Sequence, residues 1–229
     1  MLKAIVFDFD GVIVDSEPLH YKAFVGIARE KGLDFTYEEY ALKYIGYDDR
    51  DAFRAMLKEI DVGPVDERDV EVLGQRKRKL FADVVNQGVR EFPGVRAFID
   101  HLMNRIPIAI ASGATRHDID LILEKLDLGD RFAPIVSADD VTSSKPDPET
   151  YRRSVEDLAR RHPSLDLTSA DCLAIEDTEA GIRSARAAGL RTLGITHSDL
   201  DQDLHAADRI IGSFENLCLD TLQDWYGGS

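Results

Sequence analysis

Cysteine and long apolar stretches are both scarce in this sequence. The 229 residues include two cysteines, Cys172 and Cys218, which are too few for a disulfide framework or a cysteine-based zinc site. No stretch approaches the roughly 20 apolar residues that a membrane-spanning helix needs, and charge interrupts the first apolar run too early for a signal peptide. We therefore expect a cytoplasmic protein that does not enter a membrane.

Basic residues are also scarce relative to acidic ones. Lysine and arginine total 28 against 43 aspartate and glutamate residues, which gives a formal net charge of −15 at pH 7. A chain of this charge repels nucleic acid and anionic lipid surfaces, so neither is an expected partner. If the substrate is an anion, its binding site must supply positive charge locally.

The composition otherwise suits a globular protein with a substantial core. Hydrophobic residues make up 44% and charged residues 31% of the chain, which excludes a disordered polypeptide. The length fits one domain, or one domain that carries a modest insertion.

Short apolar runs end abruptly in polar residues at four places in the sequence. These runs are Ala4–Phe7, Ile108–Ala111, Leu173–Ile175 and Thr192–Ile195. Continuous apolar runs are typical of strands that are buried on both faces of a sheet. Helical patterns separate them, so we predict an α/β fold with a Rossmann-like parallel sheet and helices on both faces. Ligands of such sheets bind beyond the carboxyl ends of the strands, where the polar residues should converge.

The segment between the first two runs lacks this strand pattern. From about Glu17 to about Arg90, apolar residues recur at helical spacing. We therefore predict an all-α helical cap, residues 16–92, inserted after the first strand of a core formed by residues 1–15 and 93–229. The cap would lie over the strand ends, because the chain leaves and re-enters the core there.

Acidic residues follow two of the apolar runs directly. Asp8, Asp10 and Gly11 follow the first run, and a turn without chemistry is one interpretation of Asp-Gly. Two carboxylates spaced in this way can also point at one Mg²⁺, and one of them could accept a phosphoryl group. Glu176 and Asp177 end the third run, where a helix N-cap is the alternative. Beside Asp8 and Asp10, they complete a plausible set of oxygen ligands.

Two further segments could bind phosphate. Ser112 and Gly113 precede a predicted helix, and free N–H groups at a helix start can bind phosphate, although an ordinary helix cap also explains this segment. Lys145 is followed by Pro146 and Pro148. The prolines restrict the backbone and so aim the lysine side chain, whereas a surface lysine is the alternative.

Together and in this order, these segments resemble the four motifs of the haloacid dehalogenase (HAD) superfamily. The motifs are residues 8–16, Ser112, Lys145 with Pro146, and Glu176 with Asp177. Their order and spacing match across nearly the whole chain, and the predicted insertion resembles the C1-type cap of that superfamily. The sequence resembles most the branch of β-phosphoglucomutase, phosphoglycolate phosphatase and sugar phosphatases. The motifs are specific as a set, although each is weak alone.

The resemblance implies a role for each acidic residue. Asp8 is expected to be the nucleophile, and Asp10 the general acid that protonates the leaving alcohol and then activates water. Mg²⁺ would be held by the side chain of Asp8, the backbone carbonyl of Asp10 and the side chain of Asp177. Glu176 would support the metal through water.

The resemblance also implies a phosphate site and a cap that selects the substrate. Ser112, Gly113 and Lys145 would bind the transferred phosphoryl group. In the cap, His20 occupies a place where β-phosphoglucomutase-like proteins carry a histidine that couples substrate binding to cap closure. An exposed helical histidine is the alternative.

Two basic residues of the predicted cap are candidates for binding the rest of the substrate. Arg50 belongs to residues 46–50, which resemble the specificity loop of the cap, and it could meet an anionic or hydroxylated substrate tail. Lys77 belongs to a basic run, residues 76–79, of which one member could face the site. A solvated surface position is the alternative for both.

The implied function is a Mg²⁺-dependent phosphatase that hydrolyses a small phosphorylated metabolite through an aspartyl-phosphate. A sugar phosphate or a phosphoglycolate-like compound is the expected substrate. A β-phosphoglucomutase-type mutase is the alternative. Against it, Gly113 to Arg116 replace a Ser-Lys-Asn stretch of the mutase, and Ile45 and Asp49 stand where the mutase places basic residues. Arg116 could partly substitute for the missing contacts.

A non-catalytic interpretation also remains open. The chain could bind phosphorylated metabolites without turning them over, but Asp8 and Asp10 are both present. A small phosphorylated metabolite is the expected partner in either case, and we expect a monomer or a weak dimer.

Overall fold

The structure is a computed structural model that describes residues 1–44, 49–60, 64–197 and 203–226. The chain divides into two compact units. Residues Met1–Asp15 and Arg90–Ser229 form one of them, which we call the core unit, and Ser16–Val89 form the other, which we call the inserted unit. The inserted unit is therefore one continuous stretch of sequence between the first strand and the rest of the core unit.

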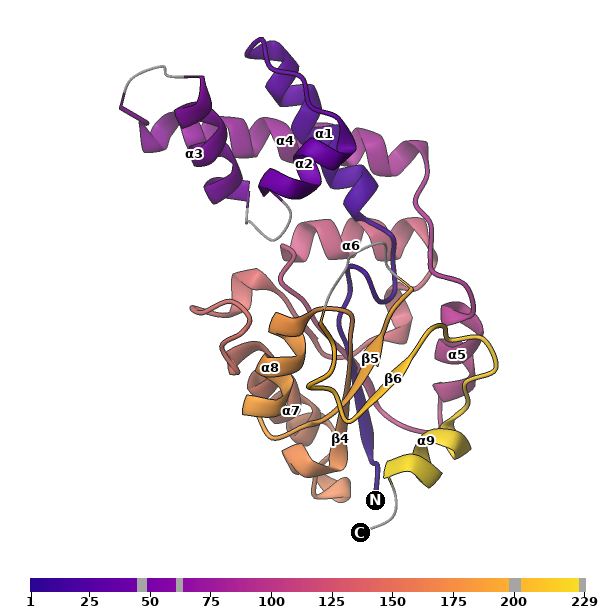
Figure 1. Cartoon of the computed structure of the whole chain (residues 1–229). Helices are drawn as coiled ribbons and strands as arrows, with labels where there is room; N and C mark the ends of the chain where they lie inside the picture. The colour runs from indigo at the N-terminus through magenta and orange to yellow at the C-terminus, as the bar shows by residue number, and fades with distance from the viewer. Residues whose placement is uncertain (45–48, 61–63, 198–202, 227–229) are drawn as a thin grey trace. The chain divides into compact units, whose positions relative to one another are not determined.

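A parallel sheet forms the centre of the core unit (Figure 1). Its order among the described residues is β3-β2-β1-β4-β5-β6, the order of a doubly wound Rossmann-type sheet. The strands are β1 (Ala4–Phe7), β2 (Ile108–Ala111), β3 (Ile135–Val136), β4 (Cys172–Glu176), β5 (Arg191–Ile195) and β6 (Arg209–Ile211). The predicted fold class is therefore confirmed, with two edge strands, β3 and β6, that the apolar runs did not reveal.

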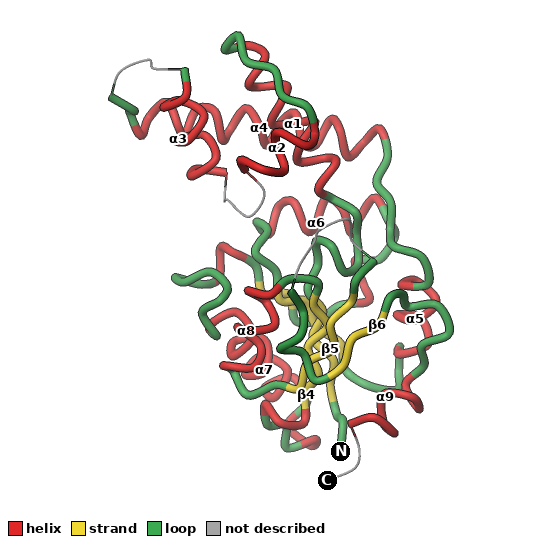
Figure 2. Tube along the Cα trace, in the orientation of Figure 1, coloured by secondary structure: helices red, strands yellow, loops and turns green. Residues whose placement is uncertain are grey.

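Each strand directs alternate side chains to opposite faces of the sheet. Ala4 and Val6 of β1 pack in one apolar cluster with Tyr151. The ring of Phe7 lies on the opposite face, where its centroid is 6.1 Å from that of Phe98. The helices are α5 (Val95–Leu102), α6 (Arg116–Lys125), α7 (Glu149–Arg161), α8 (Glu179–Ala187) and α9 (Leu219–Tyr226). Figure 1 and Figure 2 show α7 and α8 on one side of the strands, and α5 and α9 on the other.

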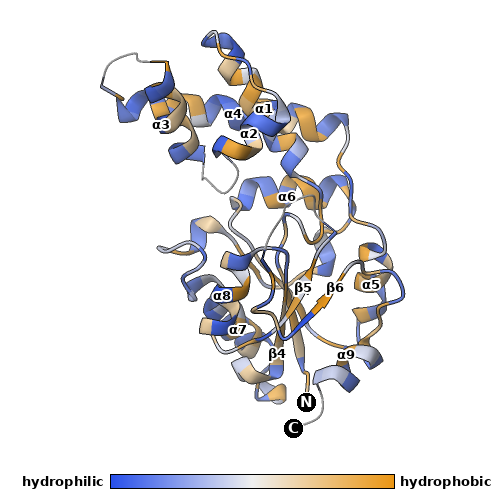
Figure 3. Ribbon diagram, in the orientation of Figure 1, coloured by the Kyte–Doolittle hydropathy of each residue, from blue (hydrophilic) through white to orange (hydrophobic). Residues whose placement is uncertain are grey.

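The described residues of the inserted unit fold into helices, as the periodicity predicts. These helices are α1 (Glu17–Glu30), α2 (Tyr37–Tyr44), α3 (Asp49–Glu59) and α4 (Glu67–Gln87). They carry both hydrophobic and hydrophilic residues in Figure 3, as expected for helices that bury one face. Aromatic rings fill their shared core, where Phe24 lies 5.3 Å from Phe53 and 4.7 Å from Tyr44 between ring centroids.

The structure shows the state of both cysteines and the apolar character of the described helices. Cys172 is a buried free thiol, whose pKa burial raises to about 12, and Cys218 is also free. Among the described residues, no helix has both the length and the apolar character needed to cross a bilayer.

Candidate active site

The register of the sheet brings three chain segments level with one another. Phe7 of β1 pairs with Ile110 of β2 on one side and with Ile175 of β4 on the other. The next residue of each strand or loop is therefore level with its neighbours, and these residues are Asp8, Ala111 and Glu176. The carboxyl ends of the central strands converge on one place, as the sequence predicted for this edge of the sheet.

Lys145 contacts all three of these segments. Its Nζ atom lies 2.6 Å from Oδ1 of Asp8, 2.9 Å from the carbonyl oxygen of Ala111 and 2.6 Å from Oε1 of Glu176. The side chain is 12% exposed, so it is a largely covered member of the cluster. Lys145 is therefore not the surface lysine that its segment alone would suggest.

Glu176 is held at both of its carboxylate oxygens. Tyr151 donates its hydroxyl to Oε1 at 2.9 Å. Oε2 accepts from the backbone N–H groups of Asp177 and Thr178, at 3.1 and 3.2 Å, and from the Thr178 hydroxyl at 3.0 Å. Gly181 packs directly against the Glu176 carboxylate, where a Cβ atom would collide with it. These contacts orient Glu176 toward Lys145 and the start of α8. Tyr151, which the sequence did not mark, belongs to the site.

The electrostatics of the cluster follow from its burial. Burial raises the pKa of Asp8 well above its usual range, and the negative charges of Glu176 and Asp177 add to this, while Lys145 opposes it. Burial also disfavours the charge of Lys145, but attraction by Asp8 and Glu176 outweighs it and raises the pKa of Lys145. Burial, followed by the charge of Glu176, raises the pKa of Tyr151, so its hydroxyl keeps its proton.

The acidic residues of the cluster can hold a metal ion. Asp8, Glu176 and Asp177 are buried and each offers a carboxylate oxygen, with these atoms within 4.8 Å of one another. If all three are ionised, Lys145 compensates one negative charge, and the remainder matches the charge of a divalent cation. Oxygen donors suit hard cations such as Mg²⁺. The donor set therefore fits a divalent metal, with Glu176 already committed to contacts within the protein.

The segment after Asp8 turns sharply toward Asp177. Gly11 has a φ angle of +79°, which L-residues rarely adopt, and a Cβ atom there would collide with the Asp177 carboxylate. The N–H of Gly11 donates to the Val14 carbonyl at 2.9 Å, and Ile13 donates to Phe9 at the same distance. Asp10-Gly11 thus forms a turn, as its composition suggests, and the turn lies beside the acidic cluster.

Ser112 and Gly113 lead from β2 into α6. The buried Ser112 accepts a hydrogen bond at Oγ from the N–H of Ala114 at 2.9 Å. A Cβ atom at Gly113 would meet open space. Thr115 is the N-cap of α6 and accepts from the N–H of Asp118 at 3.2 Å. The predicted helix cap is present, and a helix start also offers N–H groups to an anion.

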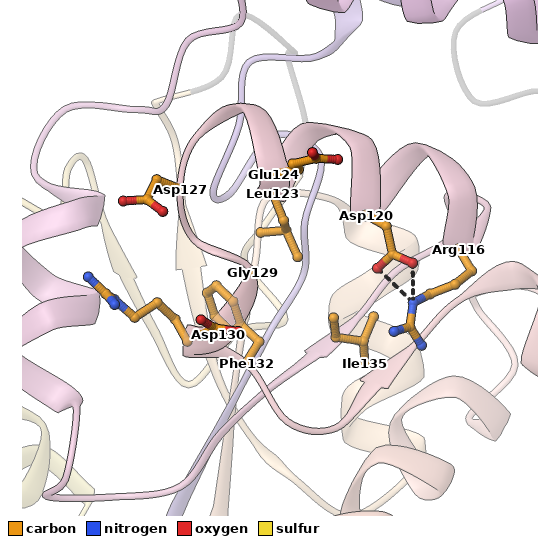
Figure 4. Close-up of a pocket in the computed structure, with 10 residues that line it drawn as sticks. Arg116, Asp120, Leu123, Glu124, Asp127, Gly129, Asp130, Phe132 and Ile135 are labelled. Carbon is orange, nitrogen blue, oxygen red and sulfur yellow. Dashed lines mark hydrogen bonds and ion pairs between the residues drawn. The ribbon is translucent and has the colours of Figure 1, made fainter.

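Arg116 is the first residue of α6 and lies beside a pocket. Its Nε atom is 2.8 Å from Oδ1 of Asp120, one turn further along the helix. Both residues line a pocket of about 340 Å³ that is bounded by α6 and residues 129–132 (Figure 4). In this structure Arg116 is therefore paired with a carboxylate of its own helix.

Within the inserted unit, Lys77 joins two of the predicted cap residues. Its Nζ atom lies 2.8 Å from Nδ1 of His20 and 2.8 Å from Oδ1 of Asp49. The Lys77 side chain is 3% exposed, whereas Arg76 and Lys79 of the same basic run are exposed.

The position of His20 keeps its ring neutral. The ring stacks on Phe81 with centroids 4.4 Å apart. Burial, followed by the charge of Lys77, lowers the pKa of His20 well below its usual range. His20 can therefore accept the hydrogen bond from Lys77 at neutral pH.

The predicted specificity loop is described in part. Residues 45–48, including Ile45, lie outside the described residues. Asp49 and Arg50 begin α3, and the exposed Arg50 lies 3.5 Å from Oε2 of Glu71.

His197 is a further residue that the sequence did not mark. It follows β5, and its Nε2 atom lies 3.0 Å from the carbonyl oxygen of Gly11. Its ring stacks on Phe92 with centroids 3.8 Å apart. The available signal was its place just after the fourth apolar run, where polar residues were expected to converge.

Comparison with known proteins shows the family of the chain. The sequence model of a family described as haloacid dehalogenase-like hydrolase matches residues 5–195. The chain therefore belongs to the haloacid dehalogenase-like hydrolases and is an enzyme of that family.

Three proteins illustrate what the chain is similar to. The "Phosphorylated carbohydrates phosphatase" of Thermotoga maritima is 28% identical over 199 residues, which cover 86% of this chain and 87% of the relative. The "Beta-phosphoglucomutase" of Bacillus subtilis is 28% identical over 229 residues, which cover 98% of this chain and 96% of the relative. A crystal structure of CbbY from Rhodobacter sphaeroides in complex with phosphate superimposes with a TM-score of 0.82 at 25% identity, covering 97% of this chain and all of that chain (100%).

Proposed function

We propose that the protein is a Mg²⁺-dependent phosphatase that hydrolyses a small phosphorylated carbohydrate or a phosphoglycolate-like compound through an aspartyl-phosphate on Asp8. The observation that carries the proposal is the buried cluster of Asp8, Lys145, Glu176 and Asp177 at the carboxyl ends of the central strands. The names of the relatives, a phosphatase of phosphorylated carbohydrates and a phosphosugar mutase, support this substrate class.

In the first step, Asp8 attacks the phosphorus atom of the substrate. One Asp8 oxygen forms a bond to phosphorus while the bond from phosphorus to the substrate oxygen breaks, and Asp10 donates a proton to the departing alcohol. Lys145, 2.6 Å from Asp8, is placed to stabilise negative charge on the phosphoryl oxygens. Ser112 and the N–H groups at the start of α6 bind the same oxygens.

In the second step, Asp10 takes a proton from water as the water oxygen attacks phosphorus. The bond between Asp8 and phosphorus breaks, so inorganic phosphate leaves and both aspartates return to their starting states. One carboxyl group thus serves as acid and then as base, which is why its position matters in both steps.

The metal would be held by the side chains of Asp8 and Asp177 and by the backbone carbonyl of Asp10. A bound Mg²⁺ would supply positive charge to the phosphoryl oxygens. Glu176, whose oxygens accept from Tyr151, Lys145 and Thr178, orients Lys145 and supports the metal site indirectly. Gly113 leaves room for the phosphate.

We further propose that residues 16–92 act as a cap that selects the substrate for a catalytic core of residues 1–15 and 93–229. His20 and Lys77, which contact each other at 2.8 Å, are the cap residues proposed to bind the substrate, together with Arg50. The free thiols of Cys172 and Cys218 support a reducing, cytoplasmic location.

A phosphatase is favoured over a mutase because of how the basic candidates are paired. Lys77 contacts Asp49, as reported above, and Arg50 contacts Glu71. Arg116, which could replace a missing mutase contact, pairs with Asp120. A mutase must hold a bisphosphate in two orientations and so needs unneutralised cations for a second phosphate. The mutase remains the alternative, and a non-catalytic phosphometabolite-binding protein is the second.

Phosphate release with Mg²⁺ across sugar phosphates, phosphoglycolate and nucleotides tests the proposal, with Asp8→Asn as the control. β-Glucose 1-phosphate is included, and formation of glucose 6-phosphate is followed in parallel. Phosphate released from one class of compound by the wild type but not by Asp8→Asn is the expected result. Isomerised sugar phosphate with little free phosphate would establish the mutase. No turnover in a folded sample that binds Mg²⁺ would favour the binding protein.

A further inference from the structure

His197 contacts the turn that carries Asp10 from a different strand of the sheet. It follows β5, whereas the turn follows β1. The distance from its Nε2 atom to the Gly11 carbonyl oxygen is 3.0 Å, which is a good hydrogen bond. Its ring lies nearly parallel to that of Phe92, with an interplanar angle of 14°.

The two segments that His197 contacts are themselves joined by backbone hydrogen bonds. Phe92 donates its N–H to the carbonyl of Ile13 at 3.1 Å, and Asp15 donates to the carbonyl of Arg90 at 3.0 Å. The segment that leaves the core unit and the segment that returns to it therefore form one hydrogen-bonded piece. The His197 ring rests on the returning segment, while its Nε2 atom holds the departing one.

The hydrogen bond selects one tautomer of His197. A carbonyl oxygen accepts hydrogen bonds, so Nε2 must carry the proton. Burial lowers the pKa of His197, which favours the neutral ring, although contacts to the Gly11 and Val12 backbone oppose this. Nδ1 is buried and has no hydrogen-bond partner among the described residues. The stack on Phe92 therefore orients a ring whose one N–H group points at Gly11.

The turn needs an anchor of this kind, because Gly11 adopts a positive φ angle and glycine is the residue with the widest range of backbone conformations. If the backbone rotates at Gly11, the direction of the Asp10 side chain relative to the rest of the turn changes. The Gly11 carbonyl belongs to the peptide between Gly11 and Val12, so a hydrogen bond to it restricts this rotation.

We propose that His197 is a positioning residue for Asp10, which it orients by holding the Gly11 carbonyl. This inference rests on the proposed function, in which Asp10 protonates the leaving alcohol. The contacts of His197 described in the structure are to Gly11, Val12, Phe92 and Phe214, none of which is a proposed ligand of the phosphoryl group or the metal. Its loss should therefore matter most for substrates whose leaving group needs a proton.

A variant without the N–H donor of His197 should lose different amounts of activity on two kinds of phosphate ester. His197→Phe keeps an aromatic ring for Phe92 but removes the N–H group. An alkyl phosphate needs a proton from Asp10, whereas p-nitrophenyl phosphate releases a stable phenolate without one. General acid catalysis is worth about 100-fold or more, so partial misplacement of Asp10 should lower kcat/KM for the alkyl ester about tenfold. The aryl ester should lose much less, and His197→Gln, which retains an N–H donor, should recover part of the loss.

A second measurement does not depend on activity. Hydrogen exchange at the amides of Gly11, Ile13 and Val14, which donate within the turn, should be faster in His197→Phe than in the wild type. The amides of β1 should exchange at unchanged rates. His197→Gln should lie closer to the wild type.

The two measurements separate the inference from the proposed function. If the wild type hydrolyses neither of these esters nor any compound of the panel given under the proposed function, the proposed function fails, and the exchange rates alone decide whether His197 holds the turn. Unchanged exchange at the three turn amides overturns the inference. Equal losses on the alkyl and aryl esters also overturn it, because a merely structural role would lower both alike.

Discussion

The ammonium group of Lys145 lies among carboxylates that repel one another when ionised. It contacts Asp8 and Glu176 at 2.6 Å each, and Asp177 belongs to the same cluster. Removing one partner from a buried ion pair leaves an uncompensated buried charge, which costs more than the pair itself contributes. At the scale of single residues, the stability of the metal-free site should therefore depend on Lys145.

Lys145→Met is expected to lower the free energy of unfolding by about 3 kcal/mol in the presence of a chelator. Urea unfolding at neutral pH measures the change. Lys79→Met, at an exposed position of α4, is the matched control and should stay within about 0.5 kcal/mol of the wild type. Equal midpoints for Lys145→Met and the wild type would contradict the assignment of Lys145 as the buried counter-ion.

Lys77 should control the titration of His20. The charge of Lys77 is one cause of the lowered pKa of His20, after burial. Lys77→Met removes that charge, so the pKa of His20 should rise toward its usual value of 6.5 without reaching it, because burial remains. An NMR titration of the His20 ring measures the shift. Lys79→Met, two residues along the same helix, should leave the pKa where it is, and an unmoved pKa in Lys77→Met would refute the contact.

At the scale of elements, two threonine N-caps differ in what else they contact. Thr178 caps α8 by accepting from the N–H of Gly181 at 3.0 Å, and it also donates to Oε2 of Glu176 at 3.0 Å. Thr115 caps α6 by accepting from Asp118 at 3.2 Å. One cap thus supports a carboxylate of the site in addition to its helix.

Thr178→Ala and Thr115→Ala should each lower stability by about 1 kcal/mol, the usual cost of a lost cap. Thr178→Ala should also lower Mg²⁺ affinity or turnover about tenfold, because partners that orient site carboxylates have effects of this size. Thermal unfolding and metal titration measure the two effects. Thr178→Ser should restore both. The same loss of Mg²⁺ affinity in Thr115→Ala would show that capping alone explains it.

The central strands were predictable because they are buried on both faces. The apolar runs mark β1, β2, β4 and β5, whose buried positions are filled largely by apolar residues because both faces of the sheet are covered. The edge strands are different: β3 spans two residues, and Ile210 of β6 is 44% exposed. Neither carries a burial signal long enough to read as a strand.

The site was predictable where adjacent polar residues end a buried run. Asp8 and Glu176 meet that condition, and the register places them beside each other. Tyr151 and His197 reach the site from α7 and from beyond β5, and their roles depend on how helices and strands pack in three dimensions. The separation of such residues along the sequence does not give the distance between them in space.

At the scale of the whole molecule, the net charge of −15 opposes the binding of a phosphate ester. In the proposed function, Lys145 and the N–H groups at the start of α6 offset this charge locally. Without a metal, the cluster has more carboxylates than cations. Repulsion between the ionised carboxylates should make the free energy of unfolding depend on pH.

Asp8→Asn should be more stable than the wild type in a chelator at pH values above the ordinary pKa of aspartate. The pKa of folded Asp8 is raised above its ordinary value of 3.8, so the folded state binds this proton more tightly than the unfolded state. The free energy of unfolding of the wild type therefore falls as the pH rises toward the pKa of folded Asp8, whereas asparagine cannot ionise.

Urea unfolding of both proteins across the acidic to neutral range measures this difference. The stability advantage of Asp8→Asn should vanish below the ordinary pKa of aspartate, where Asp8 is protonated in both states. Mg²⁺ should reverse the order at neutral pH, since it binds the ionised wild-type site better than the variant. A difference that is independent of pH would contradict the raised pKa of Asp8.

Asp8 is the proposed nucleophile that attacks phosphorus, and the phospho-enzyme tests this role most directly. The wild type and Asp10→Asn are mixed with Mg²⁺ and a hydrolysed substrate, quenched in acid, digested and analysed by mass spectrometry, with Asp8→Asn as the control. We predict a phosphoryl group on Asp8 that persists longer in Asp10→Asn than in the wild type, and none in Asp8→Asn. Continued turnover by a pure Asp8→Asn sample, with no phosphorylated peptide at any time in the other two proteins, would contradict the account.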